Sequence, residues 1–252
     1  MNKKLLAVGG IAVAAVAAIA IWWFASTGID NPVDVTAPPL AADTTVPAEA
    51  TGDTATPDTP PSESTEPTDA TAGASDGAVT YELGEESSVA FELDEELRGS
   101  PFRVVATNSE VAGQIRVDAS DLSTAEVGTI VIGAQTFATE SSNRDRAIRG
   151  PILDSNTFQT IQFVSTSIEG LSGPAAMDEA FEFTVTGDLT VRDITLPVTF
   201  TVSAVLTEGG LVGSAETTVL SSAYGLAIPS VPSVANVADE VLLRIEFVAP
   251  PA

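Results

Sequence analysis

The feature that most limits how this chain can fold is an alternation of nonpolar and polar side chains through most of residues 79–252. In residues 181–186, the sequence FEFTVT places nonpolar side chains at every second position, and residues 198–206 and 243–247 repeat the pattern. Successive side chains of a β-strand point to opposite faces, so a period of two indicates a strand with one nonpolar and one polar face. The alternation therefore predicts at least eight half-buried, antiparallel strands.

Turn-forming residues are expected to separate several of these strands. Gly187-Asp188, Gly209-Gly210 and the stretch SGPAA at 172–176 have the composition of turns. Short helices are expected only within residues 141–158. Strands with a single nonpolar face bury it by closing into a barrel or by stacking as a sandwich. The residues alone leave both folds open, and a barrel of about eight strands either fills its interior with side chains or holds one small ligand.

The charge and the missing residue types narrow the function. The 252 residues include 35 acidic and 10 basic side chains, which give a net charge of −25. A nucleic-acid-binding protein needs clustered Lys and Arg, so that class is not expected. Without His or Cys, the chain has no Ser-His-Asp or Cys-His catalytic system and no zinc site built on these residues. Asp239 and Glu240 point to opposite faces of a strand, so we predict no catalytic residue, no metal ligand and no enzyme.

The N-terminal part of the chain predicts a membrane anchor. Lys3 and Lys4 precede an uncharged stretch from Leu5 to Phe24, which at about 1.5 Å per residue spans the roughly 30 Å of a hydrocarbon core. The stretch ends in aromatic residues that favour the membrane interface. We expect residues 1–29 to be a cytoplasmic stub and a retained signal-anchor helix, with the rest extracytoplasmic. A secreted protein with a cleaved signal peptide is the alternative.

Residues 30–78 differ in composition from the part that follows. The stretch is rich in Pro, Thr, Ala, Ser and acidic residues, and it is poor in large nonpolar side chains. Such a sequence buries too little nonpolar surface to offset the entropy that is lost on ordering. We interpret it as a disordered tether between the membrane helix and a β-domain of residues 79–252.

Four motifs give residues 79–248 a resemblance to the YceI-like family, the polyisoprenoid-binding bacterial β-barrels of lipocalin-like shape. They are VAGQIRVDASDLSTA, TESSNRDRAIRGPILDSNTFQTIQF, FTVTGDLTVRDITLPVTFTV and LSSAYGLAIPSVPSVANVADEVLLRIEF, in this order along the chain. The resemblance implies an all-β, antiparallel, lipocalin-like barrel of about eight strands with one or two short helices, preceded by the N-terminal transmembrane helix and the linker. It also implies a long, narrow nonpolar tunnel for an isoprenoid or similar lipid chain.

On this resemblance, the inward faces of the strands supply the candidate ligand-binding residues of the barrel lumen. They are Phe163, Phe181, Phe183, Val185, Phe200, Val202, Leu243, Ile245 and Phe247. The residues alone explain each of them equally well as ordinary core, so both roles stay open. Arg144, Asp145 and Tyr224 match family positions and are candidates for the barrel mouth. For Arg144 and Asp145 the alternative is an internal ion pair or cap that fixes a loop.

The sequence and the resemblance together predict a membrane-tethered, extracytoplasmic lipid-binding protein. It would hold an isoprenoid or a similar long-chain amphiphile in the lumen for storage, transport or sequestration. A bound isoprenoid quinone or other lipid is the only cofactor-like molecule expected. The predicted partners are this lipid and the membrane, through the N-terminal helix, and the oligomeric state is left open. The alternative is a ligand-free surface or envelope-stress interaction domain with a solid core.

Overall fold

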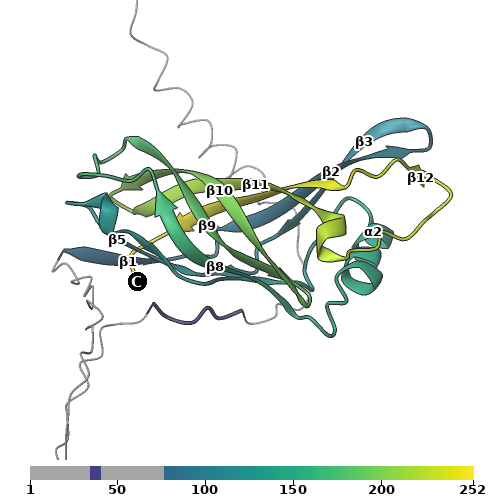
Figure 1. The fold of residues 1–252 in the computed structure, drawn as a ribbon, viewed down its shortest axis with the longest axis horizontal. Helices are drawn as coiled ribbons and strands as arrows, with labels where there is room; N and C mark the ends of the chain where they lie inside the picture. Colours follow the sequence, from purple (N-terminus) through teal and green to yellow (C-terminus); the bar gives the residue numbers. More distant parts are fainter. Residues whose placement is uncertain (1–34, 41–76) are drawn as a thin grey trace, which may run out of the picture.

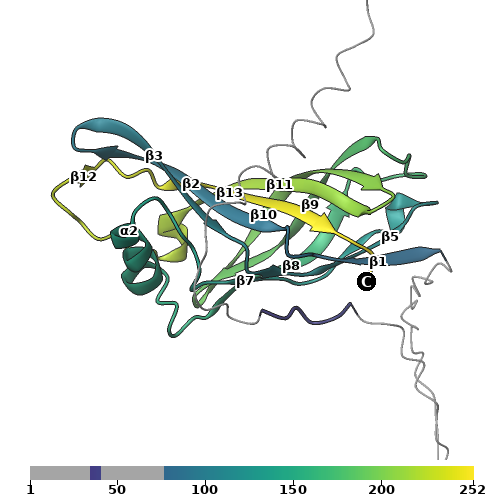
Figure 2. The same cartoon turned by 180° about the vertical axis from the view of Figure 1, so that it is seen from behind.

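The computed structural model describes residues 35–40 and 77–252. The predicted membrane helix and most of the predicted tether lie outside the described residues. Within the described part, no helix combines the length and the hydrophobicity needed to cross a membrane. Residues 77–252 form an elongated, antiparallel β-barrel with one short α-helix beside it, as Figures 1 and 2 show from opposite sides. The predicted all-β barrel is therefore confirmed.

Strands account for most of the barrel domain. They are β1 (Ala78–Glu82), β2 (Ser88–Leu97), β3 (Ser100–Asn108), β4 (Val111–Ala112), β5 (Gln114–Asp118), β6 (Glu126–Val127), β7 (Ile130–Gly133), β8 (Thr160–Glu169), β9 (Ala180–Val191), β10 (Ile194–Thr207), β11 (Gly210–Leu220), β12 (Val234–Ala235) and β13 (Glu240–Ala249). The helical segments are the 3-10 turns η2 (Leu122–Thr124) and η4 (Ser221–Tyr224), the α-helix α2 (Ser142–Ala147) and the π-helical turn η3 (Ile148–Ile152).

Several strands are close in sequence and continue one another along the same side of the barrel wall. β1 is followed by β2, β3 by β4 and β5, and β6 by β7, and each series forms one side of the wall. The main ladder runs from β2 through β13, β11, β10, β9, β8 and β7 to β4. β3 pairs with β2, and β1, β5 and β6 form an adjoining three-stranded sheet. With each series counted once, and with β12 counted together with β13 because both pair with β2, the described residues provide eight strand positions, in line with the eight or more that the sequence predicts.

Backbone hydrogen bonds join the first strand to the end of the last. Glu82 N donates to Pro250 O over 3.0 Å, and Ala252 N donates to Thr80 O over 3.0 Å. Further along, β2 pairs with β13 over residues 242–246. These bonds close the ring on this side, whereas among the described residues no backbone ladder joins β6 to β8.

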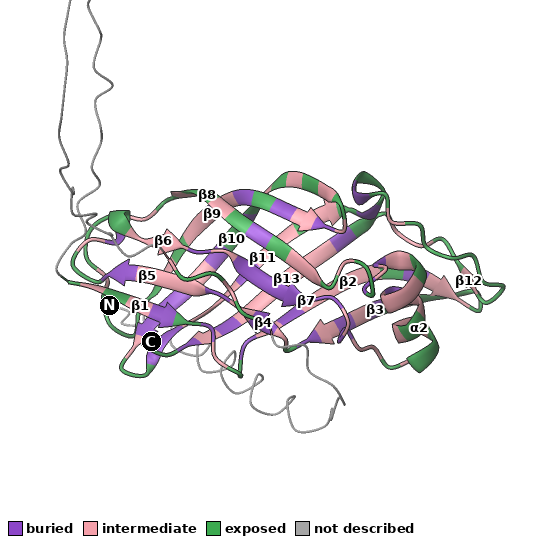
Figure 3. Ribbon diagram, turned by 90° about the horizontal axis from the view of Figure 1, so that it is seen from below, coloured by how far each residue is buried: buried purple, intermediate pink, exposed green. Residues whose placement is uncertain are grey.

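Burial alternates along the strands as the period of two predicts, and Figure 3 shows the resulting bands. The predicted turn at Gly187-Asp188 is wrong, because both residues lie inside β9 and the chain reverses at Arg192-Asp193. Arg192 takes the positive φ of 58° that this tight turn needs. Gly187 has a different purpose, since a β-carbon there would meet the backbone O of Val164 on β8 and lie 2.6 Å from Cζ of Phe163. The glycine makes room for the backbone of β8 and for a ring, and it does not form a turn.

The other predicted turns and helices are present. Gly209-Gly210 lies at the reversal between β10 and β11, and residues 172–176 lie in the loop between β8 and β9. The region 141–158 contains α2 and η3, which are the short helices expected there. These turns and short helices were predictable because the residues that form them are neighbours in the sequence.

The two ends of the barrel are covered in different ways. At the end that carries α2, called the α2 end, Ile148, Leu153 and Tyr224 are buried in the hydrophobic core. The opposite end, called the β5 end, is covered by the loops that follow β5 and β8. Leu122 N donates to Gly173 O over 2.7 Å, and Ala175 N donates to Ala119 O over 2.8 Å, so these two loops are joined.

Candidate functional site

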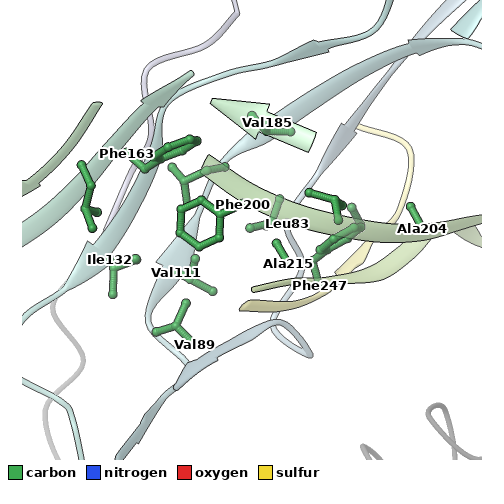
Figure 4. Close-up of a cluster of buried hydrophobic side chains, with 14 of the residues drawn as sticks. Leu83, Val89, Val111, Ile132, Phe163, Val185, Phe200, Ala204, Ala215 and Phe247 are labelled. Carbon is green, nitrogen blue, oxygen red and sulfur yellow. The ribbon is translucent and has the colours of Figure 1, made fainter. Parts of the chain in front are cut away.

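A nonpolar cavity of about 70 Å³ lies inside the barrel, in the half nearer the β5 end. Its wall comes from strands around the ring and consists of nonpolar side chains only. Figure 4 shows Phe163, Phe200 and Phe247 within the cluster of buried side chains that includes part of this wall. A wall of this kind gives a bound molecule no charge and no side-chain hydrogen bond, so it suits a hydrocarbon.

Two aromatic pairs shape the cavity. Phe163 and Phe200 meet edge to face with ring centroids 5.1 Å apart and an interplanar angle of 77°, and each is only 4% exposed. Phe181 and Phe183 stack with centroids 5.9 Å apart and an interplanar angle of 21°, but both are only half-buried. The first pair is therefore held in the core, whereas the second has more freedom to move.

Small residues at inward positions explain how the large rings fit. Gly187 lies against the ring of Phe163, and a β-carbon at Gly213 would lie 2.6 Å from Cζ of Phe247. Ala215, two residues after Gly213, lines the cavity as well. At the two glycines, the missing side chain leaves volume that an aromatic side chain from a neighbouring strand fills.

The structure places eight of the nine predicted lumen residues around this cavity. They are Phe163, Phe181, Phe183, Val185, Phe200, Val202, Ile245 and Phe247. Leu243 does not line the cavity, because it pairs with Phe91 and lies where the interior is filled by the contact between Phe91 and Phe137. A contact between these residues and a ligand stays a prediction.

Arg144 and Asp145 make structural contacts at the α2 end and do not line the cavity. Arg144 Nη2 bonds to Glu95 Oε1 over 2.8 Å, Arg144 also pairs with Glu140, and its guanidinium lies 5.3 Å from the ring centroid of Phe102. Asp145 Oδ1 accepts from both the backbone N and the hydroxyl of Thr139, each over 2.7 Å. This geometry is the internal ion pair and loop cap that the sequence offered as the alternative.

Tyr224, the third predicted mouth residue, is buried at the α2 end with 3% of its surface exposed. Its hydroxyl makes no hydrogen bond within the described part of the chain, and burial raises the pKa of Tyr224 above its ordinary value. The following residue, Gly225, has φ of 61° and ends η4. Tyr224 thus belongs to the packing that fills the α2 end and does not line the cavity.

Asp239, which the sequence excludes as a member of a catalytic pair, makes structural hydrogen bonds. Asp239 accepts hydrogen bonds from the Ser222 hydroxyl, the Ser222 backbone N and the Ser221 hydroxyl, over 2.5, 2.7 and 2.8 Å. The bond from the Ser222 hydroxyl is the main cause that lowers the pKa of Asp239. Across residues 35–40 and 77–252, no three acidic side chains gather as a metal site would require.

Several wall residues were not among the predicted site residues. Ile115 and Val117 lie on β5, and Leu122 and Leu171 come from the two loops that cover the β5 end. The alternation in QIRVD indicates the inward positions of Ile115 and Val117. Nothing in the sequence pattern places Leu122 or Leu171, since loops have no fixed period and their positions depend on the tertiary fold.

The fold and the cavity define this molecule as a small antiparallel β-barrel with a nonpolar interior. The chain belongs to the family of the YceI-like domain, whose family model matches residues 81–249. The predicted family is thereby confirmed.

Solved structures share the fold. BcnA of Burkholderia cenocepacia is 18% identical with a TM-score of 0.51, and the match covers 66% of this chain and 98% of that one. A polyisoprenoid binding domain from Saccharophagus degradans, described as implicated in plant cell wall breakdown, is 10% identical with a TM-score of 0.54. That match covers 69% of this chain and 99% of the domain. The search of the curated proteins returns no match.

Proposed function

We propose that this protein binds one long nonpolar chain, such as an isoprenoid lipid, inside its barrel. The observation that carries the proposal is the cavity wall, which is made of nonpolar side chains alone. Burial of each CH₂ group from water contributes about 0.8 kcal/mol, so a chain of repeated hydrocarbon units gains affinity with length and needs no polar contact. Membership of the YceI-like family and the fold shared with a polyisoprenoid binding domain support this class of ligand.

The cavity has to widen to hold such a chain. Its volume is about 70 Å³, whereas pockets for drug-sized ligands have roughly 300–1,000 Å³. Phe181 and Phe183 are the aromatic wall residues that are not fully buried. We expect rotation of these two rings to enlarge the cavity, because the edge-to-face pair of Phe163 and Phe200 is buried in the core.

The cellular setting is part of the same proposal. A signal-anchor helix at residues 1–29 and a Pro-rich, acidic tether would hold the barrel outside the cytoplasm, within reach of lipids that leave the membrane surface. The composition of residues 1–78 supports this arrangement. Carbonate washing of membranes tests it: the full-length protein should stay in the membrane fraction with its N-terminus intact. A mature N-terminus near Ser26 would instead show a cleaved signal peptide.

The second candidate is a domain that binds no small molecule and serves in surface contacts or envelope stress. The observation in its favour is the small volume of the cavity together with the full burial of Phe163, Phe200 and Phe247. A barrel of about eight strands has an interior that side chains alone can fill.

Organic extraction of the purified full-length protein, followed by mass spectrometry, separates the two candidates. We expect a long-chain lipid in about stoichiometric amount, and a matched extraction of Phe183→Trp should recover less of it, because the indole takes up cavity volume. Binding is then checked by adding retinol, a fluorescent isoprenoid alcohol, to the delipidated protein. A protein that carries no lipid and binds no retinol would support the solid-core candidate.

A further inference from the structure

One junction of the barrel wall is held differently from the rest. β6 pairs with β5 only, and β8 beyond Phe163 pairs with β9 only. We call the line between β6 and residues 164–169 the seam. Within the described residues, the hydrogen bond that crosses the seam is that of the Ser165 hydroxyl to Val127 O. Since a ladder of backbone bonds is absent here, the seam is the part of the wall that separates at least cost.

The cavity lies directly behind the seam. Val127 on β6 and Ile168 on β8 both contribute to the cavity wall, as do Ala125 and Leu171 at the ends of the same segments. Separation of β6 from β8 would therefore open the nonpolar interior to the outside through the side of the barrel.

The backbone of β8 is irregular at the same place. Its register with β9 shifts between Ser165 and Ser167, which is a β-bulge. The hydroxyl of Thr166, the residue between them, bonds to Thr186 O over 3.1 Å. A bulge bends its strand and disrupts the local ladder, so β8 is weakened on its β9 side and unpaired on its β6 side.

A separate segment of the chain lies across the end of the seam. Residues 35–40, which we call the strap, run in extended conformation along the outer wall beside β7 and β8 (Figures 1 and 2). Leu40 N donates to Gln114 Oε1 over 3.0 Å, and the Leu40 side chain lies over Gly128. These residues fall within the stretch that the sequence interpreted as a tether, yet here they contact the barrel.

The burial of β7 shows what the strap covers. Ile130 faces the cavity, so Val131 faces outward. Even so, Val131 is only 5% exposed, and it lines a groove together with Val35, Thr36 and Pro38 of the strap. The strap thus covers the outer face of β7 where β7 pairs with β8, at the point where the ladder ends and the seam begins.

The ends of the barrel offer no comparable route. The α2 end is packed with buried side chains that include Ile148, Leu153 and Tyr224. At the β5 end, the two covering loops are joined by backbone hydrogen bonds at Leu122 and Ala175. Opening either end breaks the contacts of several packed side chains or several backbone bonds. Among the described residues, the seam is crossed by one hydrogen bond, from the Ser165 hydroxyl.

We propose that the seam is the entrance through which a long nonpolar ligand reaches the cavity, and that the strap limits how far the seam opens. This inference rests on the proposed function, and it adds the route and its control. When the strap is docked, it clamps the four residue pairs of the β7–β8 ladder. When the strap leaves, separation that starts between Val127 and Ser165 can extend into that ladder.

A disulfide between the strap and the wall tests the inference in the full-length chain. A β-carbon at Gly128 would lie 3.2 Å from Leu40 Cγ, which places thiols at positions 40 and 128 within disulfide reach. Because the chain has no other Cys, Leu40→Cys with Gly128→Cys has one possible intramolecular bridge. The protein is delipidated and placed in lipid nanodiscs, and retinol uptake is followed by stopped-flow fluorescence with empty nanodiscs subtracted.

The oxidised double variant should take up retinol about tenfold more slowly than its reduced form, with similar loading at equilibrium, because locking the strap lowers the population of the open seam. The reduced form is the matched control for folding, and the single variants control for each thiol. Leu40→Ser, which weakens the strap, should speed uptake. Equal rates in the oxidised and reduced forms, with retinol bound in both, would overturn the inference but leave the proposed function. Absence of retinol binding in every form would overturn both.

Discussion

Replacement of Phe183 and of Phe200 by Trp distinguishes a cavity from a solid core. Both side chains line the same cavity, but they differ in their surroundings. Phe200 is 4% exposed and meets the ring of Phe163 at 5.1 Å, whereas Phe183 is half-buried beside the free volume of about 70 Å³. The added ring of Trp should therefore be accommodated at position 183 and cause strain at position 200.

The expected sizes follow from these surroundings. Overpacking of a dense core costs about 1–3 kcal/mol, and for a domain of this size each kcal/mol lowers Tm by roughly 2–4 °C. Phe200→Trp should lower Tm by about 2–12 °C, and Phe183→Trp should change it by less than about 3 °C. If the indole at 183 displaces about two methylene groups of a ligand, at about 0.8 kcal/mol each, retinol binding weakens roughly tenfold.

Thermal unfolding by circular dichroism and retinol titration of the delipidated protein measure the two effects. Phe183→Ala and Phe200→Ala serve as matched controls, because the second should cost about 3–5 kcal/mol through an unfilled cavity and the first distinctly less. Equal loss of stability in both Trp variants, with unchanged retinol affinity, would refute the reasoning. In that case the interior at Phe183 is as dense as at Phe200, and no ligand occupies it.

Three further predictions follow from single contacts. Gly187→Ala should lower stability by about 1–3 kcal/mol in urea unfolding, because its β-carbon meets the backbone O of Val164 and lies 2.6 Å from Cζ of Phe163; an unchanged midpoint would show that both the β8 backbone and the ring give way. Arg144→Ala should cost about 3–5 kcal/mol, because Glu95, whose side chain is 6% exposed, loses its partner; altered retinol affinity with intact stability would contradict the structural role. Asp239 has a lowered pKa in the folded protein, so its stabilising effect is complete above the ordinary value of 3.8 and is lost as the pH falls through the folded pKa. Asp239→Asn should therefore flatten the acid limb of a plot of Tm against pH, and an unchanged limb would exclude this group.

The sequence predicted the inward faces well, because a strand converts a period of two directly into a face. Phe181, Phe183, Val185 and Ile245 point to the cavity as the alternation indicates. The same rule also selected Leu243, which faces inward but lies where other side chains fill the barrel. Position along the barrel axis depends on strand pairing across distant parts of the chain, and the alternation carries no information about it.

Local composition predicted the positions of single residues less well than the alternation predicted the inward faces. Gly187-Asp188 has the chemistry of a turn, but the glycine lies in a strand because a neighbouring ring needs its space. Residues 35–40 have the composition of a linker, yet a short extended segment with Leu40 and two prolines contacts an outer wall. Both cases depend on a partner from elsewhere in the fold, which local patterns do not show.

The closure of the ring by the segment after β13 has a consequence for how the chain folds. Val248 N bonds to the Ser87 hydroxyl across 161 positions of sequence, and Pro250 and Ala252 pair with β1. A ribosome makes β1 long before residues 248–252, so during synthesis β1 has an open edge and no partner on that side. Folding should be slow, as is usual for β-proteins with distant pairings, and the waiting edge is a site for aggregation. The open edge of β1 is therefore the part of the growing chain that most needs protection until residues 248–252 have been made.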